Sequence, residues 1–274
     1  MTRTLIPVFL AVITACGLSA APAPAQADRY GLFERILDTY VRDGYVYYRA
    51  LKLERANLDR FIGTLNVSAA EVASWSKADQ QAFWINTYNA LVLQTVINDY
   101  PSGNRSSAFP ANSIRQTPGA FQRITHQVGG QSLTLDDLET KVITAFGDAR
   151  LVLALGRGAT ASPRLKSEVY RAAKLETQLA DAVKECATRR SCFRIEETTQ
   201  RVEMSAIIGW NQALFEAAVP AAPGPWASRS PLERAVLTLF APHLFPTERT
   251  FLNENHFQMA YGEFDWTLND LTGR

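Results

Sequence analysis

The densest pattern of hydrophobic positions lies in residues 81–100, QAFWINTYNALVLQTVINDY, and it predicts one long helix. Apolar residues recur there at helical spacing on two adjacent stripes, so that most of the circumference is apolar. Such a helix has to meet protein on nearly all sides. We therefore expect it to be the central buried helix of the fold.

Two asparagines, Asn86 and Asn89, interrupt this apolar helix. Asparagine is a poor helix former, and a buried amide without a partner costs about 1–3 kcal/mol. Each amide should therefore have a defined hydrogen-bonding role. One interpretation is that they brace neighbouring backbone, and the other is that they line a ligand site.

Weaker patterns predict the elements before the central helix. Helical periodicity covers residues 30–42, which Gly44 ends, and residues 52–65; Ser68 can cap a short helix through Trp75, and Ser76 another that runs into the central one. The aromatic cluster Tyr45, Tyr47 and Tyr48 suits either a core strand or a ligand-facing surface.

The middle of the chain combines a hairpin, a capped helix and a buried run. Pro101 closes the central helix, residues 101–118 form a polar loop, and residues 121–128 and 131–133 flank a Gly-Gly turn. Thr134 can cap the next helix, which has three acids in its first turns. The apolar run 151–155 predicts a buried strand, followed by the small-residue loop 156–162 and by helices over 165–171 and 175–186.

The loop 156–162 is the strongest local candidate for a binding site. If Ser162 caps a helix whose first residue is Pro163, the strand, loop and helix N-terminus would direct backbone N–H groups toward a cleft that accepts an anion or an oxyanion. The loop matches neither the phosphate-loop pattern nor the dinucleotide fingerprint, so its signal alone is weak.

The C-terminal third predicts a hairpin over 193–196 and 201–204, followed by a helix over 206–217. A second helix begins with a capping box at Ser230 and ends before Pro242, and a strand-like tail covers 257–266. We predict an α+β fold: a helix-rich single domain over residues 28–274, with a small mixed or antiparallel sheet packed around the central buried helix. Its parts are a helical portion (28–80), a main block (81–218), a Pro-rich connector (219–229) and a C-terminal return (230–274). The return is too short to form a separate core.

The first 27 residues have the pattern of a signal peptide. Arg3 precedes an apolar run over 5–18, and Ala25-Gln26-Ala27 forms a cleavage site for export to the periplasm or the medium. The alternative is a lipoprotein anchored through Cys16, because Ile13-Thr14-Ala15-Cys16 resembles a lipobox.

The charge balance and the cysteines limit the kinds of partner and site that we expect for this chain. Removing Arg3 with the signal leaves 28 − 1 = 27 basic and 27 acidic side chains, which gives no electrostatic reason to expect nucleic acid. We expect no transmembrane segment in the mature chain, because no second apolar stretch reaches ~18 residues. We expect no metal site, because the three histidines are scattered, and no cofactor. Cys186 and Cys192, the remaining cysteine pair in an exported chain, should form a disulfide.

Four blocks in order resemble the family called domain of unknown function 547, over roughly residues 83–269. They are Phe83-Trp-Ile-Asn-Thr-Tyr-Asn-Ala90, Leu133-Thr-Leu-Asp-Asp-Leu-Glu139, Asp148-Ala-Arg150 before an Ala-Leu pair and a downstream Ser-Pro, and Phe264-Asp-Trp-Thr-Leu-Asn269. The positions that carry over are Asn86, Asn89, Glu139, Arg150, Asp265 and Asn269. We expect Arg150, Asp265 and Asn269 to be structural.

The resemblance also shows what this chain lacks. Where family members commonly have histidine or cysteine, it has Thr140, Val152, Arg157 and Ser162. If the family pattern marks a thiol active site, both nucleophile and base are missing here.

We therefore expect a non-catalytic envelope protein, a pseudoenzyme that binds a small ligand or an envelope protein through Asn86, Asn89, Arg157 and Thr160. In place of binding a ligand, Arg157 could form an ordinary ion pair with Glu139 or Asp148. The alternative function is a hydrolase or transferase with a rearranged site that uses Glu139 and Ser162.

We predict that the mature protein begins at Asp28, because Ala25-Gln26-Ala27 follows the apolar run. The intact mass of the exported form should equal that of residues 28–274. A mass corresponding to an acylated N-terminal Cys16 would contradict this and indicate a membrane anchor.

Overall fold

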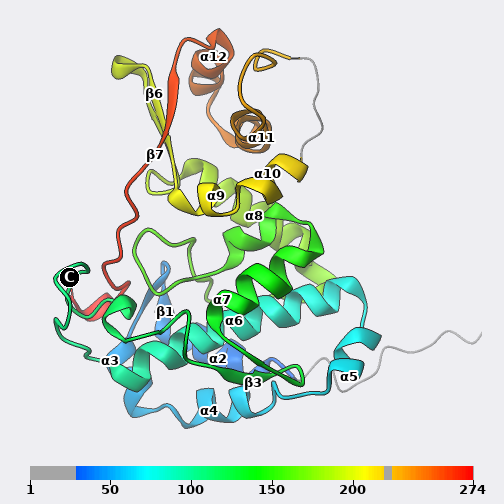
Figure 1. The fold of residues 1–274 in the computed structure, drawn as a ribbon, viewed down its shortest axis with the longest axis vertical. Coiled ribbons are helices and arrows are strands. Elements are labelled where there is room, and N and C mark those ends of the chain that lie inside the picture. The colour runs from blue at the N-terminus through cyan, green and yellow to red at the C-terminus, as the bar shows by residue number, and fades with distance from the viewer. Residues whose placement is uncertain (1–28, 219–223, 274) are drawn as a thin grey trace, which may run out of the picture.

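The computed structural model describes residues 29–218 and 224–273. The predicted signal peptide with Cys16, and residues 219–223 of the predicted connector, lie outside the described residues. The fold is α+β and helix-rich, with small separate sheets, as predicted. Figure 1 shows a lower part built around one long helix and an upper part of shorter helices and a three-stranded sheet.

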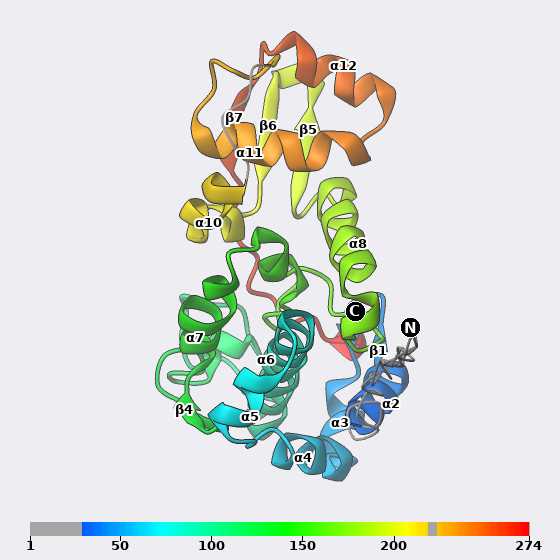
Figure 2. The ribbon, with the colours of Figure 1, turned by 90° about the vertical axis from the view of Figure 1, so that its right-hand side faces the viewer.

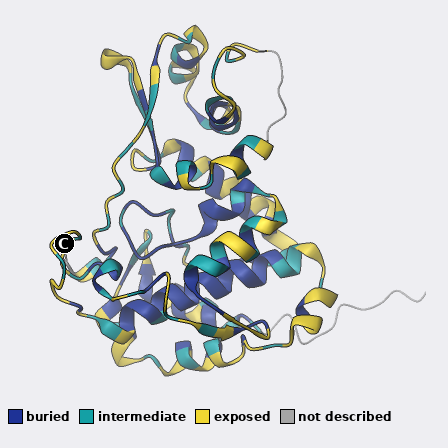
Figure 3. Cartoon of the chain, viewed as in Figure 1, coloured by how far each residue is buried: buried dark blue, intermediate teal, exposed yellow. Residues whose placement is uncertain are grey.

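The long helix is α6, Lys77–Asp99, and it is the predicted central helix. The Ser76 hydroxyl accepts a hydrogen bond from the Asp79 N–H at 3.1 Å and so caps its start. Almost every residue from Gln81 to Ile97 is buried, and Figure 3 shows this helix as the largest buried segment. It lies at the centre of the lower hydrophobic core.

The N-terminal elements cover α6 from below. They are α2 (Gly31–Tyr40), the hairpin β1 (Val41–Arg42) with β2 (Tyr45–Val46), α3 (Tyr48–Leu53), α4 (Ala56–Gly63) and α5 (Ala69–Ser74). The Phe33 ring of α2 stacks on Phe61 of α4, with centroids 4.7 Å apart. The predicted helix 52–65 is thus two helices, and Tyr48 is a buried helical residue instead of part of a core strand.

The segment after α6 contains the main corrections. The hairpin β3 (His126–Val128) with β4 (Gln131–Leu133) forms around the predicted Gly-Gly turn, but its first strand is shorter than the predicted range 121–128. Thr134 caps α7 (Leu135–Asp137), as predicted. The π-helical turn η2 (Leu138–Ile143) continues α7, and η3 (Thr144–Phe146) follows. The predicted strand 151–155 is wrong, because these residues belong largely to the buried 3-10 helix η4, Ala149–Ala154. A short apolar run fits a buried helix as well as a strand.

The predicted helix that begins at Pro163 is also wrong, and residues 163–171 have no helix. The Ser162 hydroxyl accepts its hydrogen bond from the Arg157 N–H at 2.9 Å, so it closes the loop instead of capping a helix. Further along, the Asn86 side chain holds the Tyr170 backbone in a non-helical conformation. Helical structure returns at η5 (Ala172–Lys174) and α8 (Leu175–Thr188).

The upper part, at the top of Figure 2, contains its own sheet and helices. These elements share a second hydrophobic core. The sheet has the order β5-β6-β7, in which β5 (Phe193–Glu196) is antiparallel to β6 (Arg201–Met204) and β7 (Gln258–Tyr261) is parallel to β6. Between the parallel strands lie α9 (Ala206–Trp210), α10 (Gln212–Ala218), α11 (Pro231–Phe240) and α12 (Pro246–Glu254). The capping box predicted at Ser230 is present at the start of α11.

After β7 the chain runs back to the lower part. Leu268 pairs with Ala159, Asp270 pairs with Val46, and the Asn269 side chain accepts from Tyr48 at 2.7 Å and donates to the Gly44 carbonyl at 2.8 Å. Within residues 29–218 and 224–273, no helix has the length and apolarity that crossing a membrane requires.

Cys186 and Cys192 form the predicted disulfide, with Cα atoms 5.1 Å apart. It joins the end of α8 to the start of β5 and closes a loop of five intervening residues. Closing so short a loop should stabilise the fold by about 2–3 kcal/mol. We predict that reduction lowers the melting temperature without abolishing folding. Cys186→Ser with Cys192→Ser should reproduce the shift, and two alkylatable thiols in native exported protein would contradict the pairing.

Candidate functional site

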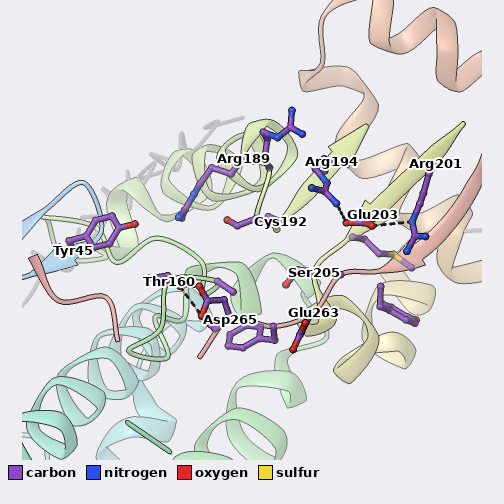
Figure 4. A pocket seen from close by; sticks show the side chains of 17 residues that line it. Tyr45, Thr160, Arg189, Cys192, Arg194, Arg201, Glu203, Ser205, Glu263 and Asp265 are labelled. Atoms are coloured by element: carbon purple, nitrogen blue, oxygen red, sulfur yellow. Dashed lines mark hydrogen bonds and ion pairs between the residues drawn. The ribbon is translucent and has the colours of Figure 1, made fainter. Parts of the chain in front are cut away.

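A wall of two chain segments separates two cavities of the described structure. Residues 159–161 of the loop after η4 run beside residues 265–268, with the Thr160 N–H donating to the Thr267 carbonyl at 2.8 Å. On one side lies a cleft of about 410 Å³ that contains Glu139 and Arg157, here called the Glu139 cleft. On the other side lies a cavity of about 660 Å³, here called the Arg189 cavity and shown in Figure 4.

The floor of the Glu139 cleft is an ion pair between Glu139 of η2 and Arg157 of the loop. The Arg157 side chain is only 2% exposed, and its guanidinium also donates to the Leu155 carbonyl at 3.2 Å. Burial alone would lower the pKa of Arg157, but the Glu139 carboxylate outweighs burial, and the pKa is raised. Arg157 is therefore a permanent buried cation whose charge is neutralised by one carboxylate.

Two more elements hold the Glu139 carboxylate. Tyr88 of α6 donates from its hydroxyl, and Asn211, which follows α9, donates from its amide, each at 3.4 Å. Burial and the nearby carboxylate raise the pKa of Tyr88 well above its usual value, so this hydroxyl stays protonated. Because Glu139 already accepts from Arg157, Tyr88 and Asn211, it is poorly suited to act as a free general base.

The rim of the cleft is aromatic and carries a second arginine. The Arg115 guanidinium lies 4.8 Å from the centroid of Phe109, 5.8 Å from Phe121 and 5.2 Å from Trp266, which is cation–π geometry. Trp210 stacks near Trp266, with centroids 6.1 Å apart and an interplanar angle of 17°, yet is 53% exposed. Flat rings and a cation therefore meet at the mouth.

Asp136 is the other acid of this cleft. Burial raises its pKa, while hydrogen bonding to Gln122 and the charge of Arg115 oppose the increase. Within the described ranges no ion pair joins Arg115 to Asp136 or to any other carboxylate, so the charge of Arg115 is balanced only by rings and by longer-range attraction.

The predicted ligand residues Asn86 and Asn89 bind backbone. Asn86 accepts from the Tyr170 N–H at 3.0 Å and donates to the Tyr170 carbonyl at 2.8 Å. Asn89 accepts from the Gly156 N–H at 2.8 Å and donates to the Ala154 carbonyl at 3.1 Å. Both amides therefore position the loop that carries Arg157, and neither lines the Glu139 cleft.

The other predicted site residues are dispersed. Ser162 is buried beside the disulfide and lines neither large cavity, and Thr160 lies in the Arg189 cavity, where its hydroxyl donates to the Asp265 carboxylate at 2.7 Å. Arg150 pairs with Asp148 at 2.7 Å and with Glu176 at 2.9 Å. Asp265 and Asn269 stabilise the returning tail through the contacts given above.

No catalytic histidine accompanies Glu139. In the described part of the chain, no hydrogen bond joins a histidine to Glu139 or Ser162. His126 lies in β3, and burial lowers its pKa. The same residues contain no group of three His, Cys, Asp or Glu side chains that could hold a metal ion.

The sequence analysis did not identify the residues that form the rim of the Glu139 cleft. Arg115 lies in a polar loop without a motif, and Trp210 and Asn211 lie at the junction of α9 and α10, so no local pattern brings them to Glu139. Trp266 lay within a block of the family resemblance but had no assigned role. The available signal was the unusual occurrence of tryptophans on exposed or connecting segments.

Comparison with known families supports the resemblance. The model of the family described as "Protein of unknown function, DUF547" matches residues 72–185. The match contains Arg115, Glu139 and Arg157, whereas Trp210, Asn211 and Trp266 lie beyond it. Searches of curated proteins and of solved structures each found no match.

We predict that Arg157→Ala destabilises the protein by about 3–5 kcal/mol, because it leaves the Glu139 charge buried without its partner. Urea unfolding measures the loss. Replacing both partners, as Arg157→Met with Glu139→Leu, should recover most of it. Arg60→Ala, on an exposed position of α4, is the matched control and should change stability by less than about 0.5 kcal/mol. Unchanged stability of Arg157→Ala would show that the pair is not structural.

Proposed function

We propose that this chain, whose residues 72–185 belong to the DUF547 family of proteins of unknown function, binds a small carboxylic acid in the Glu139 cleft without chemically transforming it. The observation that carries the proposal is Arg115, a cation on aromatic faces at the mouth of a cleft and without an ion-pair partner in the described structure. A ligand carboxylate would supply that partner.

The other residues that line the Glu139 cleft are suited to a flat ligand. Trp210 and Trp266 offer ring faces, and Asp136, Thr140 and Asn211 offer polar atoms around them. The volume of about 410 Å³ is in the range of small-molecule sites. An aromatic acid or a sugar acid would stack on the tryptophans and direct its carboxylate at Arg115.

The closed floor favours binding over catalysis. Glu139 and Arg157 neutralise each other, so neither is free to exchange a proton or to stabilise a developing charge. We also propose that this binding takes place in the periplasm or outside the cell, an assignment supported by the predicted signal peptide and by the disulfide.

The alternative function is a hydrolase or transferase that uses Glu139 and Ser162. Ser162 is buried away from the Glu139 cleft and accepts from the Arg157 N–H, which is an unfavourable arrangement for a nucleophile. A covalent fluorophosphonate adduct on Ser162, lost in Ser162→Ala, would support this alternative and overturn the binding proposal.

We predict that benzoate or glucuronate binds with measurable affinity, whereas the uncharged counterparts benzamide and glucose bind at least about tenfold more weakly, because a charge-assisted hydrogen bond contributes about 1.5–3 kcal/mol. Titration calorimetry compares the four compounds. Arg115→Gln should abolish the difference between acid and uncharged counterpart.

Two variants control this test. Trp210→Ala removes an exposed ring and should weaken all four compounds without lowering the melting temperature. Arg60→Gln removes one positive charge at an exposed position of α4 that does not line the cleft, and it should change none of the four affinities. Equal affinity for acids and uncharged counterparts, or no binding of either acid, would refute the proposal.

A further inference from the structure

We propose a second ligand site in the Arg189 cavity, on the other side of the wall, which binds a short zwitterionic peptide. The site does not depend on the function proposed for the Glu139 cleft. It combines an uncompensated cation on one side with uncompensated carboxylates on the opposite side (Figure 4).

The cation is Arg189, which follows the last residue of α8. Its guanidinium has one hydrogen bond, to the Ser162 carbonyl at the long distance of 3.5 Å, and no ion pair within the described ranges. The carboxylate that acts on it most strongly is Glu185, but Glu185 already pairs with Arg164 at 2.8 Å and with Lys166. Burial lowers the pKa of Arg189, consistent with an incompletely compensated charge.

The other arginines of the cavity are neutralised by their neighbours. Glu203 pairs with Arg201 at 3.0 Å and also with Arg194, while Arg190 pairs with Glu196 at 2.6 Å. Arg189 is therefore the arginine of this cavity that has a charge to offer a ligand.

The carboxylates are Glu263 and Asp265, on the segment that follows β7. Neither has an ion-pair partner in the described part of the chain. Asp265 accepts hydrogen bonds from the Thr160 hydroxyl at 2.7 Å and from the Thr267 N–H at 2.9 Å. Partial burial acts to raise the pKa of Asp265, but the hydrogen bonds together outweigh burial and lower the pKa. Asp265 therefore remains ionised at neutral pH.

A ligand that satisfies both sides has to carry both charges. A dicarboxylate would be repelled by Glu263 and Asp265, and a polycation by the arginines. No ion pair spans the cavity from Arg189 to either acid, so the gap is wider than one direct contact, and about 660 Å³ exceeds the needs of a single amino acid. A short peptide places its carboxylate at Arg189, its ammonium at the acids, and its backbone between them.

Trialanine is the probe, compared with N-acetyl-trialanine and with trialanine amide in titration calorimetry. We expect trialanine to bind and each blocked peptide to bind at least tenfold more weakly, because each lacks one charge. This comparison uses the unaltered protein and so does not depend on how well a variant folds. Absence of binding by trialanine, or equal binding of all three peptides, would overturn the proposal.

Variants of the protein test which residues bind each end of the peptide. Arg189→Gln should remove the penalty for amidating the C-terminus while keeping the penalty for acetylation, and Glu263→Gln with Asp265→Asn should do the reverse. Arg60→Gln and Glu254→Gln, at exposed positions of α4 and α12, are the matched controls and should leave all three affinities unchanged. If the Arg189 and acid variants leave both penalties in place, the peptide lies elsewhere and the assignment is wrong.

Discussion

The structure depends on the hydrogen bonds of two asparagine side chains in α6, a helix that is buried on nearly every side. An unpaired buried amide is costly, and α6 avoids this cost by using Asn86 and Asn89 to hold backbone of two distant segments. These hydrogen bonds fix where η4 ends and where the non-helical segment before α8 passes. They thereby fix the loop that presents Arg157 to Glu139. The core helix and the cleft are consequently parts of one hydrogen-bonded arrangement.

The same arrangement determines how the Glu139 cleft is closed at its floor. The sequence resemblance puts Arg157 at a position where family members commonly have a cysteine. The Arg157 guanidinium lies at the floor of the cleft and neutralises Glu139. The function proposed above accordingly places ligand binding at the rim, where Arg115 and the tryptophans lie. A buried ion pair of this kind is weak evidence for stability gained over an apolar alternative, but it makes each partner necessary to the other.

Sequence patterns predicted elements whose signals are local. The Ser76 and Ser230 caps, the Gly-Gly hairpin and the disulfide each depend on residues a few positions apart, and all are present. The apolar run 151–155 was misassigned because burial, and not strand pairing, accounts for its composition. The helix expected after Ser162 is absent because two hydrogen bonds compete with the local helix signals. The Ser162 hydroxyl accepts from the Arg157 N–H within the loop, and Asn86, which is distant in the sequence, accepts from the Tyr170 N–H. No local pattern predicts the cleft rim, since it joins Arg115, Asn211 and Trp266 from three separate regions.

In the wall between the cavities, the neighbouring residues Asp265 and Trp266 line different cavities. Phe264 and Asp265 line the Arg189 cavity, Trp266 lines the Glu139 cleft, and the backbone of this segment is bound to residues 159–161. Inserting or deleting one residue in this segment would shift its register against residues 159–161, and would displace Asp265 and Trp266 from the cavities that they line. The two cavities therefore cannot diverge independently in length at this segment. Within a lineage, substitutions there should accumulate without insertions or deletions, even where the flanking loops vary in length.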